Sequence, residues 1–529
     1  METSYNDIPY IGRVHHQTHI ENLAMTAKLF QLEFPDIQQC RVLELGCGDG
    51  SNIVNMAYAF PNSHFVGVDG SSVHIERGQG MVNLAGLKNV ELYAMDILNI
   101  DEDMGQFDFI ICHGVFSWVP EKVRKKILEI GQKMLTPTGI GYISYNAYPA
   151  WKQHEMLRDM MRFHAFRMED TEEQIAQARA LVQFLGEHIY HQSDSYGQFV
   201  QSQVEFISSL TGEYLFHEYL ETYNQPFWFY EFVNMLSEHD LLYLGDTDLS
   251  AMINIHWPTE TRDILNSISP TQYELEQYMD MLRCRRFRCS LFIHNDRDIS
   301  RTIEPAVFKD IYLSYKACPK WNIEDESETL ETSLGRLLVG KPDDETEDST
   351  LPQHLLYQIV FENLHNAWPK RLHFDELISK IEEQQQSPIT EQDIQDLMEL
   401  FQSLYLQGTL QIHLHNPPIA NSISERPMLS PMARHQATYQ EVISTQLHDM
   451  VVVKDTWVRT MSELLDGEHS LREIADILYD KMLKEELPPL EIGEDGAEPS
   501  SDPQEIIALM MTRMTEIMHS FLENGALVS

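Results

Sequence analysis

Short apolar runs alternate with amphipathic stretches over the first 150 residues of the chain. Strands are expected at residues 42–45, 64–68, 90–94, 107–112 and 139–144, and helices at residues 51–60, 73–86 and 123–135. Strands that alternate with helices predict a mostly parallel, doubly wound α/β sheet. Ligands bind at the carboxyl ends of the strands in such a sheet. The residues that follow each strand are therefore the first candidates for a functional site.

The pattern becomes wholly helical after residue 151 and returns to sheet-like runs near residue 240. Residues 241–245 and 287–294 predict two further strands. We therefore expect a core at residues 1–151, a helical insertion at 152–222, and a region at 223–300 that returns to complete the sheet.

The C-terminal part of the chain shows a weak internal repeat after an acidic linker, which is expected at residues 301–350. In each copy, at 351–420 and 421–529, helices precede a short strand that follows a glycine. This order resembles a winged helix, a fold that usually reads DNA with its third helix. That helix in the first copy, residues 390–406, carries four acidic residues and no Lys or Arg. We therefore expect interaction modules that do not bind nucleic acid.

The composition limits the possible partners of the chain. Lys and Arg total 38 against 82 Asp and Glu, which gives a formal net charge of −44. This balance argues against a phosphate backbone or an anionic membrane surface as the main partner. The acidity can serve solubility, which is the simpler interpretation, or the attraction of a cationic substrate.

The cysteines and the hydropathy pattern indicate a location and exclude some chemistry. The six cysteines form no CxxC pair and no zinc-type spacing, so we expect reduced thiols in the cytoplasm and no metal. No run of 18 apolar residues occurs, and the first residues lack the features of a signal peptide. We therefore expect no insertion into a membrane.

The strongest local motif is Glu44-Leu-Gly-Cys-Gly-Asp-Gly50, between a predicted strand and a predicted helix. Gly46, Gly48 and Gly50 allow the backbone to turn sharply and to approach a ligand closely. The spacing is GxGxG, whereas dinucleotide-binding folds show GxGxxG. Glu44 would also repel a pyrophosphate. The combination suits a cationic, phosphate-free adenosine ligand, although an ordinary tight turn would explain the glycines alone.

Acidic residues end the next two predicted strands as well. Asp69 can accept hydrogen bonds from both hydroxyls of a ribose, and Asp96 can hold an adenine amine while the Ile97 N–H reaches the ring. Each aspartate alone can instead be a helix N-cap. Acids at the ends of three successive strands favour a ligand site over three unrelated caps.

The sequence also resembles one bacterial family over most of its length. The resemblance is carried by residues 4–10, 17–19, 23–24, 109–120, 142–151, 217–220, 243–245 and 283–288, and more loosely by residues 434–478. Members of this family carry a class I methyltransferase domain followed by a methyltransferase regulatory domain. The best-understood members are rickettsial lysine methyltransferases that modify an outer membrane protein. The resemblance implies a Rossmann-like class I fold, S-adenosylmethionine as the cofactor and protein lysine N-methylation. Ala147, Ala150 and Gly70 depart from the family pattern, so the substrate stays open.

We expect two groups of residues around the transferred methyl group. The cofactor-binding residues are expected to be Glu44, Gly46, Cys47, Gly48, Gly50, Asn52, Asp69, Gly70, Ser71, Asp96, Ile97, His113 and Gly114, with Tyr5 and His19 from an N-terminal lid. The acceptor side is expected to consist of Trp118, Tyr145, Asn146 and Tyr148, with Asp7 from the lid. Methyl transfer from a sulfonium needs positioning and exclusion of water, and no covalent nucleophile. His113 can be a base or a hydrogen-bonded structural histidine.

Two alternatives to a protein lysine methyltransferase stay open: a methyltransferase for a small cationic molecule, and a non-catalytic protein that binds the cofactor. We also expect a homodimer through residues 152–222, because Met156, Phe163 and Phe166 belong to an apolar set that needs burial. Packing of this set on the regulatory region is the alternative. The basic run 283–288 is expected to form ion pairs within the chain.

Overall fold

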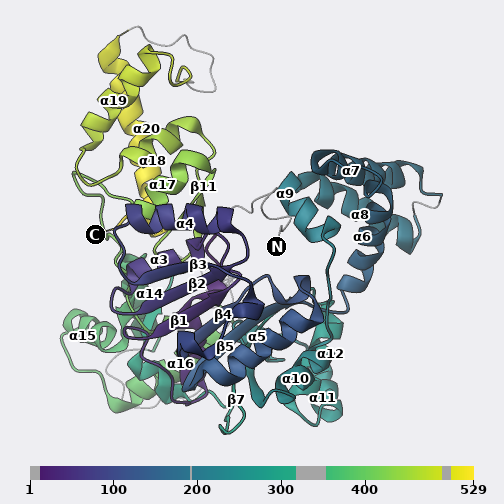
Figure 1. Cartoon of the computed structure of the whole chain (residues 1–529). Helices are drawn as coiled ribbons and strands as arrows, with labels where there is room; N and C mark the ends of the chain where they lie inside the picture. The colour runs from purple at the N-terminus through teal and green to yellow at the C-terminus, as the bar shows by residue number, and fades with distance from the viewer. Residues whose placement is uncertain (1–11, 191–192, 317–352, 491–501, 529) are drawn as a thin grey trace.

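A seven-stranded sheet forms the centre of the computed structural model, which describes residues 12–190, 193–316, 353–490 and 502–528 (Figure 1). The strand order is β3-β2-β1-β4-β5-β7-β6. The strands are β1 (Arg41–Leu45), β2 (His64–Asp69), β3 (Val90–Ala94), β4 (Phe107–Cys112), β5 (Leu135–Asn146), β6 (Leu241–Asp246) and β7 (Phe287–His294). Strands β1 to β5 are parallel, and β7 runs antiparallel to both β5 and β6. All seven predicted strands are confirmed. The order reverses between β1 and β4, so ligands are expected at their carboxyl ends.

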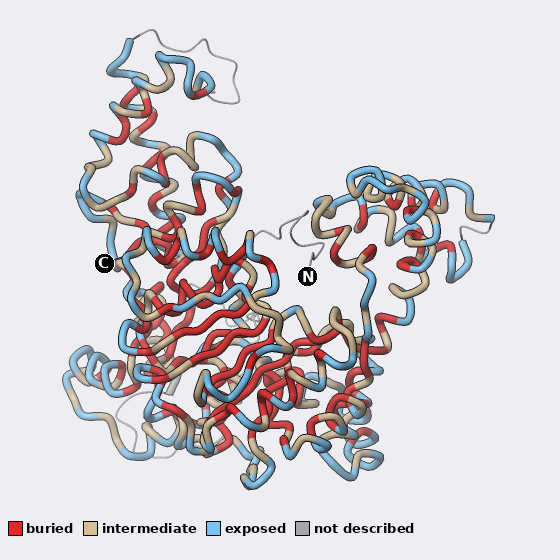
Figure 2. The backbone as a smooth tube through the Cα atoms, in the orientation of Figure 1, coloured by how far each residue is buried: buried red, intermediate tan, exposed pale blue. Residues whose placement is uncertain are grey.

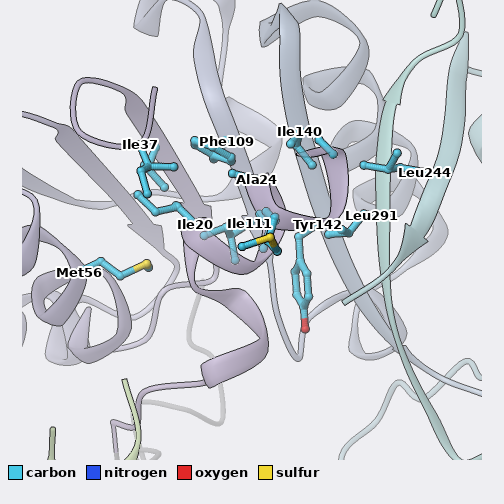
Figure 3. Packing of buried hydrophobic residues seen from close by; sticks show 14 of the residues in the cluster. Ile20, Ala24, Ile37, Met56, Phe109, Ile111, Ile140, Tyr142, Leu244 and Leu291 are labelled. Carbon is cyan, nitrogen blue, oxygen red and sulfur yellow. The ribbon is translucent and has the colours of Figure 1, made fainter. Parts of the chain in front are cut away.

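Helices flank the sheet. They are α2 (Ile20–Leu29), α3 (Ser51–Ala59), α4 (Ser72–Leu84), α5 (Glu121–Met134), α10 (Phe229–Ser237), α11 (Thr259–Ile268) and α12 (Gln272–Arg283). Of these, α3, α4 and α5 lie where the amphipathic stretches predicted helices. Figure 3 shows Ile20 and Ala24 of α2 among buried side chains of the central strands. Leu244 of β6 and Leu291 of β7 belong to the same hydrophobic cluster. The returning strands therefore share one core with the N-terminal half of the sheet.

The helical insertion stands away from the sheet and has its own small core (Figure 1). It consists of α6 (Trp151–Ala165), α7 (Thr171–His188), α8 (Ser195–Ser209), α9 (Gly212–Leu215) and the π-helical turn Phe216–Leu220. Leu157, Met161 and Val182 are buried among these helices. Much of the outer surface of the insertion is exposed (Figure 2).

The first C-terminal module is built on a three-stranded sheet of order β10-β8-β9. Its elements are β8 (Tyr312–Ser314), α14 (Gln353–Ala367), β9 (Leu372–His373), α15 (Phe374–Gln385), α16 (Glu391–Leu406) and β10 (Gln411–His413). The expected linker at 301–350 is therefore wrong at its start, because β8 is the central strand of this sheet. Phe308 and Leu313 are fully buried, and the Phe308 ring lies 6.1 Å from that of Tyr405 in α16.

The second C-terminal module has a separate hydrophobic core, to which Met510, Met514 and Phe521 contribute. It consists of α17 (Pro431–Tyr439), β11 (Val442–Ser444), β12 (Met450–Val452), α18 (Thr456–Leu464), α19 (Leu471–Leu483) and α20 (Pro503–Glu523). Helix α17 packs on α4 of the central domain (Figure 1). This module therefore covers the side of the sheet on which β2 and β3 lie.

The basic run at 283–288 pairs within the chain, as expected. Arg288 is fully buried and its guanidinium lies 2.7 Å from an Asp280 carboxylate oxygen and 2.9 Å from one of Glu276. Arg285 pairs with Asp246 at 3.1 Å. These ion pairs join β7 and β6 to α12, because a buried charge needs a partner of opposite sign.

Candidate functional site

The glycine turn after β1 is tied to the end of β2. Gly46, Gly48 and Gly50 have φ angles of +72°, +56° and +76°, which only glycine adopts without strain. The N–H groups of Gly46 and Cys47 donate to the Val68 carbonyl at 2.8 and 3.1 Å. The two strand ends are thereby held as one unit, with α3 beginning directly behind the turn.

Several glycines leave an open cradle at this edge of the sheet. A Cβ atom added at Gly48, Gly70 or Gly114 would meet no described atom within 4 Å. At Gly46 it would come within 2.4 Å of the Val115 side chain, so this glycine serves close packing instead. The open positions follow β1, β2 and β4 respectively. They define a space into which a ligand can lie against the backbone.

Glu44 is the charged group beneath this cradle. It is 3% exposed, and its Oε1 accepts a hydrogen bond from Asn52 Nδ2 at 2.8 Å. Its Oε2 is buried without a hydrogen-bond partner among the described residues. Burial raises the pKa of Glu44 to about 8, to which the nearby Asp49 and Asp69 carboxylates contribute. A buried carboxylate oxygen without a partner favours a cationic group on the ligand.

Asp69 and Asp96 both organise backbone at the strand ends. The Asp69 carboxylate accepts the Gly48 N–H at 2.9 Å and the Ser71 N–H at 2.8 Å, so it joins two of the expected cofactor loops. Asp96 accepts the Leu98 N–H at 3.0 Å and caps the short helix Ile97–Asn99. The N-cap role is therefore real for Asp96, and its contact with an adenine stays a prediction.

The N-terminal segment lies over the glycine turn from residue 12 onward. The His15 N–H donates to Asn52 Oδ1 at 3.1 Å, and the His15 ring lies 4.1 Å from that of His113. A Cβ atom at Gly12 would lie 2.1 Å from the Asp49 carboxylate, so the two segments touch. Tyr5 and Asp7 lie outside the described residues.

One candidate histidine departs from its expected role, and the other takes the structural one of its two expected roles. His19 is buried against Phe60 and against His415 and His448 of the C-terminal modules, so its assignment to the cofactor is wrong. His113 forms a 2.8 Å hydrogen bond between its Nδ1 and the Tyr142 hydroxyl. Burial holds the pKa of His113 well below its usual value, and the nearby His15 adds to this. These contacts favour the structural role for His113 over that of a base.

The residues at the end of β5 alternate between two environments. The Asn146 side chain is directed toward the loop after the insertion, where its Nδ2 donates to Asn224 Oδ1 at 3.0 Å. Tyr145 points to the other side, is 1% exposed, and stacks on Phe232 at 4.3 Å between ring centroids. Because successive side chains of a strand face opposite ways, Tyr145 is a core residue. Its expected place on the acceptor side is therefore wrong.

Aromatic rings gather around the end of β5. The Trp118 ring packs edge-on against Trp151, with 6.1 Å between ring centroids. The Tyr148 hydroxyl donates to a Glu155 carboxylate oxygen at 2.8 Å. The Lys152 Nζ lies 3.8 Å from the Tyr148 ring centroid, so this aromatic surface already accommodates an ammonium group.

Two polar residues that hold the site together could not be identified from the sequence. Asn224 follows the insertion, and its Oδ1 accepts from Asn146 Nδ2 at 3.0 Å. His448 lies in the turn between β11 and β12, and its Nε2 is 2.8 Å from Asn52 Oδ1. Both contacts join residues far apart in the chain, for which no local pattern exists.

This sheet, with an antiparallel last strand, a glycine turn over a buried acid, and aspartates at the next strand ends, defines a class I S-adenosylmethionine-dependent methyltransferase. Comparisons with known families agree. A methyltransferase domain matches residues 37–203, a "predicted methyltransferase regulatory domain" matches 211–294, and the C-terminal winged helix domain of PKMT matches 425–526. The chain belongs to the family of methyltransferases that combine these three parts.

Rickettsial proteins are among the similar ones. An uncharacterised protein of Rickettsia prowazekii is 29% identical over 526 residues, covering 99% of this chain and 93% of its own. A second is 37% identical over 230 residues, covering 44% of this chain and 92% of its own. The structure of PKMT2 from Rickettsia typhi in complex with AdoHcy matches with a TM-score of 0.84 at 29% identity, covering 98% of this chain and 100% of that one.

The residues present fit the cofactor of this class. When bound, S-adenosylmethionine supplies an electrophilic methyl group on a sulfonium. Glu44 would hold its cationic part, Asp69 its ribose, and the open glycines would leave room for it. Within the described residues, no group of His, Cys, Asp and Glu side chains is arranged to hold a metal ion. The described helices include none that is long and apolar enough to cross a membrane.

Replacing Gly48 by Val should remove binding of S-adenosylhomocysteine, because the branched side chain would fill the open cradle. Isothermal calorimetry measures this directly. Gly86→Val is the matched control: Gly86 also has a positive φ (+65°) and open space, but lies before β3 at the opposite end of the sheet. Both variants bear a similar strain of about 1–2 kcal/mol. Normal binding by Gly48→Val would show that the cofactor does not pass this glycine.

The affinity for S-adenosylhomocysteine should rise with pH up to about pH 8. Glu44, with its pKa near 8, is protonated at neutral pH in the ligand-free protein, whereas a cationic ligand favours the carboxylate. Binding then releases a proton, and affinity falls by up to about tenfold per pH unit below that pKa. Calorimetry in buffers with different heats of ionisation counts the proton. Glu44→Gln should bind more weakly and without this pH dependence; the same dependence in Glu44→Gln would contradict the assignment.

Proposed function

We propose that the chain is a protein lysine N-methyltransferase whose acceptor site lies at the end of β5. The observation that carries the proposal is the environment of Asn146. Its Nδ2 donates to Asn224, which fixes the carboxamide, and its Oδ1 has no hydrogen bond to any described residue. Asn146 ends β5, which lies next to β4, and the open Gly114 follows β4.

The chemistry of an amine acceptor suits such an oxygen. A neutral lysine amine must point its lone pair at the methyl group, and a carbonyl oxygen that accepts one of its N–H bonds orients it. As the nitrogen gains positive charge, the same dipole stabilises the forming ammonium. The Trp118 ring is partly exposed and offers apolar and π surface for the stem of the lysine. Tyr148 is 6% exposed and its ring already carries Lys152, which illustrates how an ammonium fits on such a ring.

The similar proteins support a protein substrate. PKMT2 of Rickettsia typhi, to which nearly the whole chain is similar, bears the name of a protein lysine methyltransferase and was solved with AdoHcy. The C-terminal winged-helix domain matches that of PKMT. We propose that these modules bind protein and not nucleic acid, since Glu391, Asp396 and Glu399 make α16 acidic. We also propose that the protein is located in a reducing cytoplasm, since Cys47 and Cys112 are buried free thiols beside the site.

A labelling experiment separates the protein substrate from a small one. The enzyme is incubated with tritiated S-adenosylmethionine and a bacterial lysate, with Gly48→Val as the inactive control. Label that stays with protein and appears as methyl-lysine after acid hydrolysis supports the proposal. Label that passes a small-pore filter favours the alternative, a methyltransferase for a small cationic molecule.

Asn146→Ala should lower the rate of methyl transfer by about 10- to 100-fold, the scale of one lost oriented dipole. Affinity for S-adenosylhomocysteine should change little, because the interaction belongs to the transition state. Single-turnover kinetics and calorimetry on one sample measure both. Asn254→Ala is the matched control, since Asn254 Nδ2 donates to Asn266 Oδ1 at 2.9 Å in a similar amide pair outside the site. A lower melting temperature with a normal rate would make Asn146 merely structural.

We further propose that the chain is a homodimer through the helical insertion. Phe163 is 74% exposed and Phe184 is 54% exposed, although both are large and apolar. Arg167 lies over the Phe163 ring, and exposed Glu172 and Glu173 begin the next helix. A patch with aromatic, cationic and anionic side chains can pair with a second copy of itself. The exposure of these rings argues against the alternative, packing on the regulatory region of the same chain.

Combined substitution of Phe163→Glu and Phe184→Glu should convert the dimer into a monomer, because charges would be buried without partners. Light scattering after size-exclusion chromatography gives the mass. Leu483→Glu, at a 62% exposed position of α19, controls for the added charge. A wild-type mass of one chain at all concentrations would refute the dimer.

A further inference from the structure

The turn between β11 and β12 enters the central domain from behind the glycine turn. Asn55 of α3 donates from its Nδ2 to the Thr445 carbonyl at 3.0 Å. His448 is 2% exposed and has a φ of +58°, a conformation that is unfavourable for residues other than glycine. A buried side chain on such a backbone is held by contacts that outweigh the strain.

The contacts of His448 define one protonation state. Asn55 Nδ2 is 3.1 Å from His448 Nδ1, and an amide nitrogen can only donate, so Nδ1 accepts. The proton of the neutral ring is then on Nε2, which donates to Asn52 Oδ1 at 2.8 Å. Burial keeps the pKa of His448 well below its usual value, and nearby histidines add to this, so the ring is neutral at pH 7.

The hydrogen bond from His448 fixes the orientation of the Asn52 amide in the cofactor site. Its Oδ1 accepts from His448 and from the His15 N–H, and its Nδ2 therefore faces Glu44 Oε1 at 2.8 Å. The Thr18 hydroxyl lies 2.8 Å from the His15 carbonyl, to which it can donate, while it accepts from Asn52 Nδ2 at 2.9 Å. If the amide turned over, its oxygen would face Glu44 and disfavour the ionised form that a cationic ligand requires. The donors to Asn52 Oδ1 therefore determine that Asn52 Nδ2 donates to Glu44.

We propose that the second C-terminal module contributes to cofactor binding, with His448 as a positioning residue that orients Glu44 through Asn52. The packing of this module on the central domain supports the same coupling. The Tyr439 hydroxyl of α17 lies 3.8 Å from the Met81 sulfur of α4, and the Ser51 hydroxyl at the start of α3 also lies 3.8 Å from that sulfur. A partner that displaces the module would weaken cofactor binding, and by linkage the cofactor would oppose that partner.

His448→Gly tests the proposal, because glycine keeps the left-handed backbone and removes only the ring. The affinity of the full-length chain for S-adenosylhomocysteine, measured by calorimetry, should fall about tenfold, the effect of one well-placed hydrogen bond of about 1.4 kcal/mol. Glu485→Gly is the matched control, since Glu485 is an exposed residue of the same module with a φ of +61°. It should bind normally.

A double-mutant cycle distinguishes positioning from general stability. If His448 acts through Asn52, the His448→Gly change should cost no further affinity in an Asn52→Ala background. A full tenfold loss in that background would overturn the proposal, as would normal affinity with a lowered melting temperature in the single variant. Should His448→Gly not fold, His448→Asn tolerates the same φ and is too short to reach Asn52; normal affinity there would also overturn it. No acceptor is present in these measurements, so their outcome is independent of the lysine proposal.

Discussion

The hydrogen bond between Asn52 and Glu44 is the contact on which the cofactor site depends. Glu44 is a carboxyl group in an apolar interior, and its ionised form, which a cationic ligand favours, is costly unless it has partners. Asn52 occupies one carboxylate oxygen and leaves the other for a ligand. Its own oxygen is fixed by the N-terminal segment and by the C-terminal module. Three distant parts of the chain therefore meet at one amide. The orientation of this amide determines whether Glu44, the group that a cation would contact, receives a hydrogen bond.

The central fold could be predicted from the sequence because its determinants are local. Buried strands such as β4 are short, mainly apolar runs, and the helices α3 and α4 begin after recognisable residues, Gly50 and Ser71. The strands β6 and β7 could also be found, since their apolar runs are too short for a typical helix. The three-residue strand β8 has no such period. Its membership of the first C-terminal module depends on packing that sequence reasoning does not see.

The candidate site was predictable only on the side of the glycine turn. Positive φ angles at Gly46, Gly48 and Gly50 need a particular residue type, which leaves a clear mark in the sequence. The acceptor side depends on the direction in which each side chain points. The residue types of neighbouring aromatic residues do not indicate that direction. Tyr145 and Asn146 are adjacent, yet one is in the core and the other at the edge. Asn224 and His448 reach the site from 78 and 396 residues away along the chain.

Under the two proposals, these distant residues give the additional chain a role beside the class I core. Each half of the site is completed by one side chain from outside the first 151 residues. Asn224 orients the Asn146 amide on the acceptor side, and His448 orients the Asn52 amide on the cofactor side. Each amide could rotate by 180° with little change in its shape, so each needs a hydrogen bond from outside the core to hold one orientation. In the two proposals, the regulatory region and the C-terminal module thus act on the reaction through the direction of two amide groups.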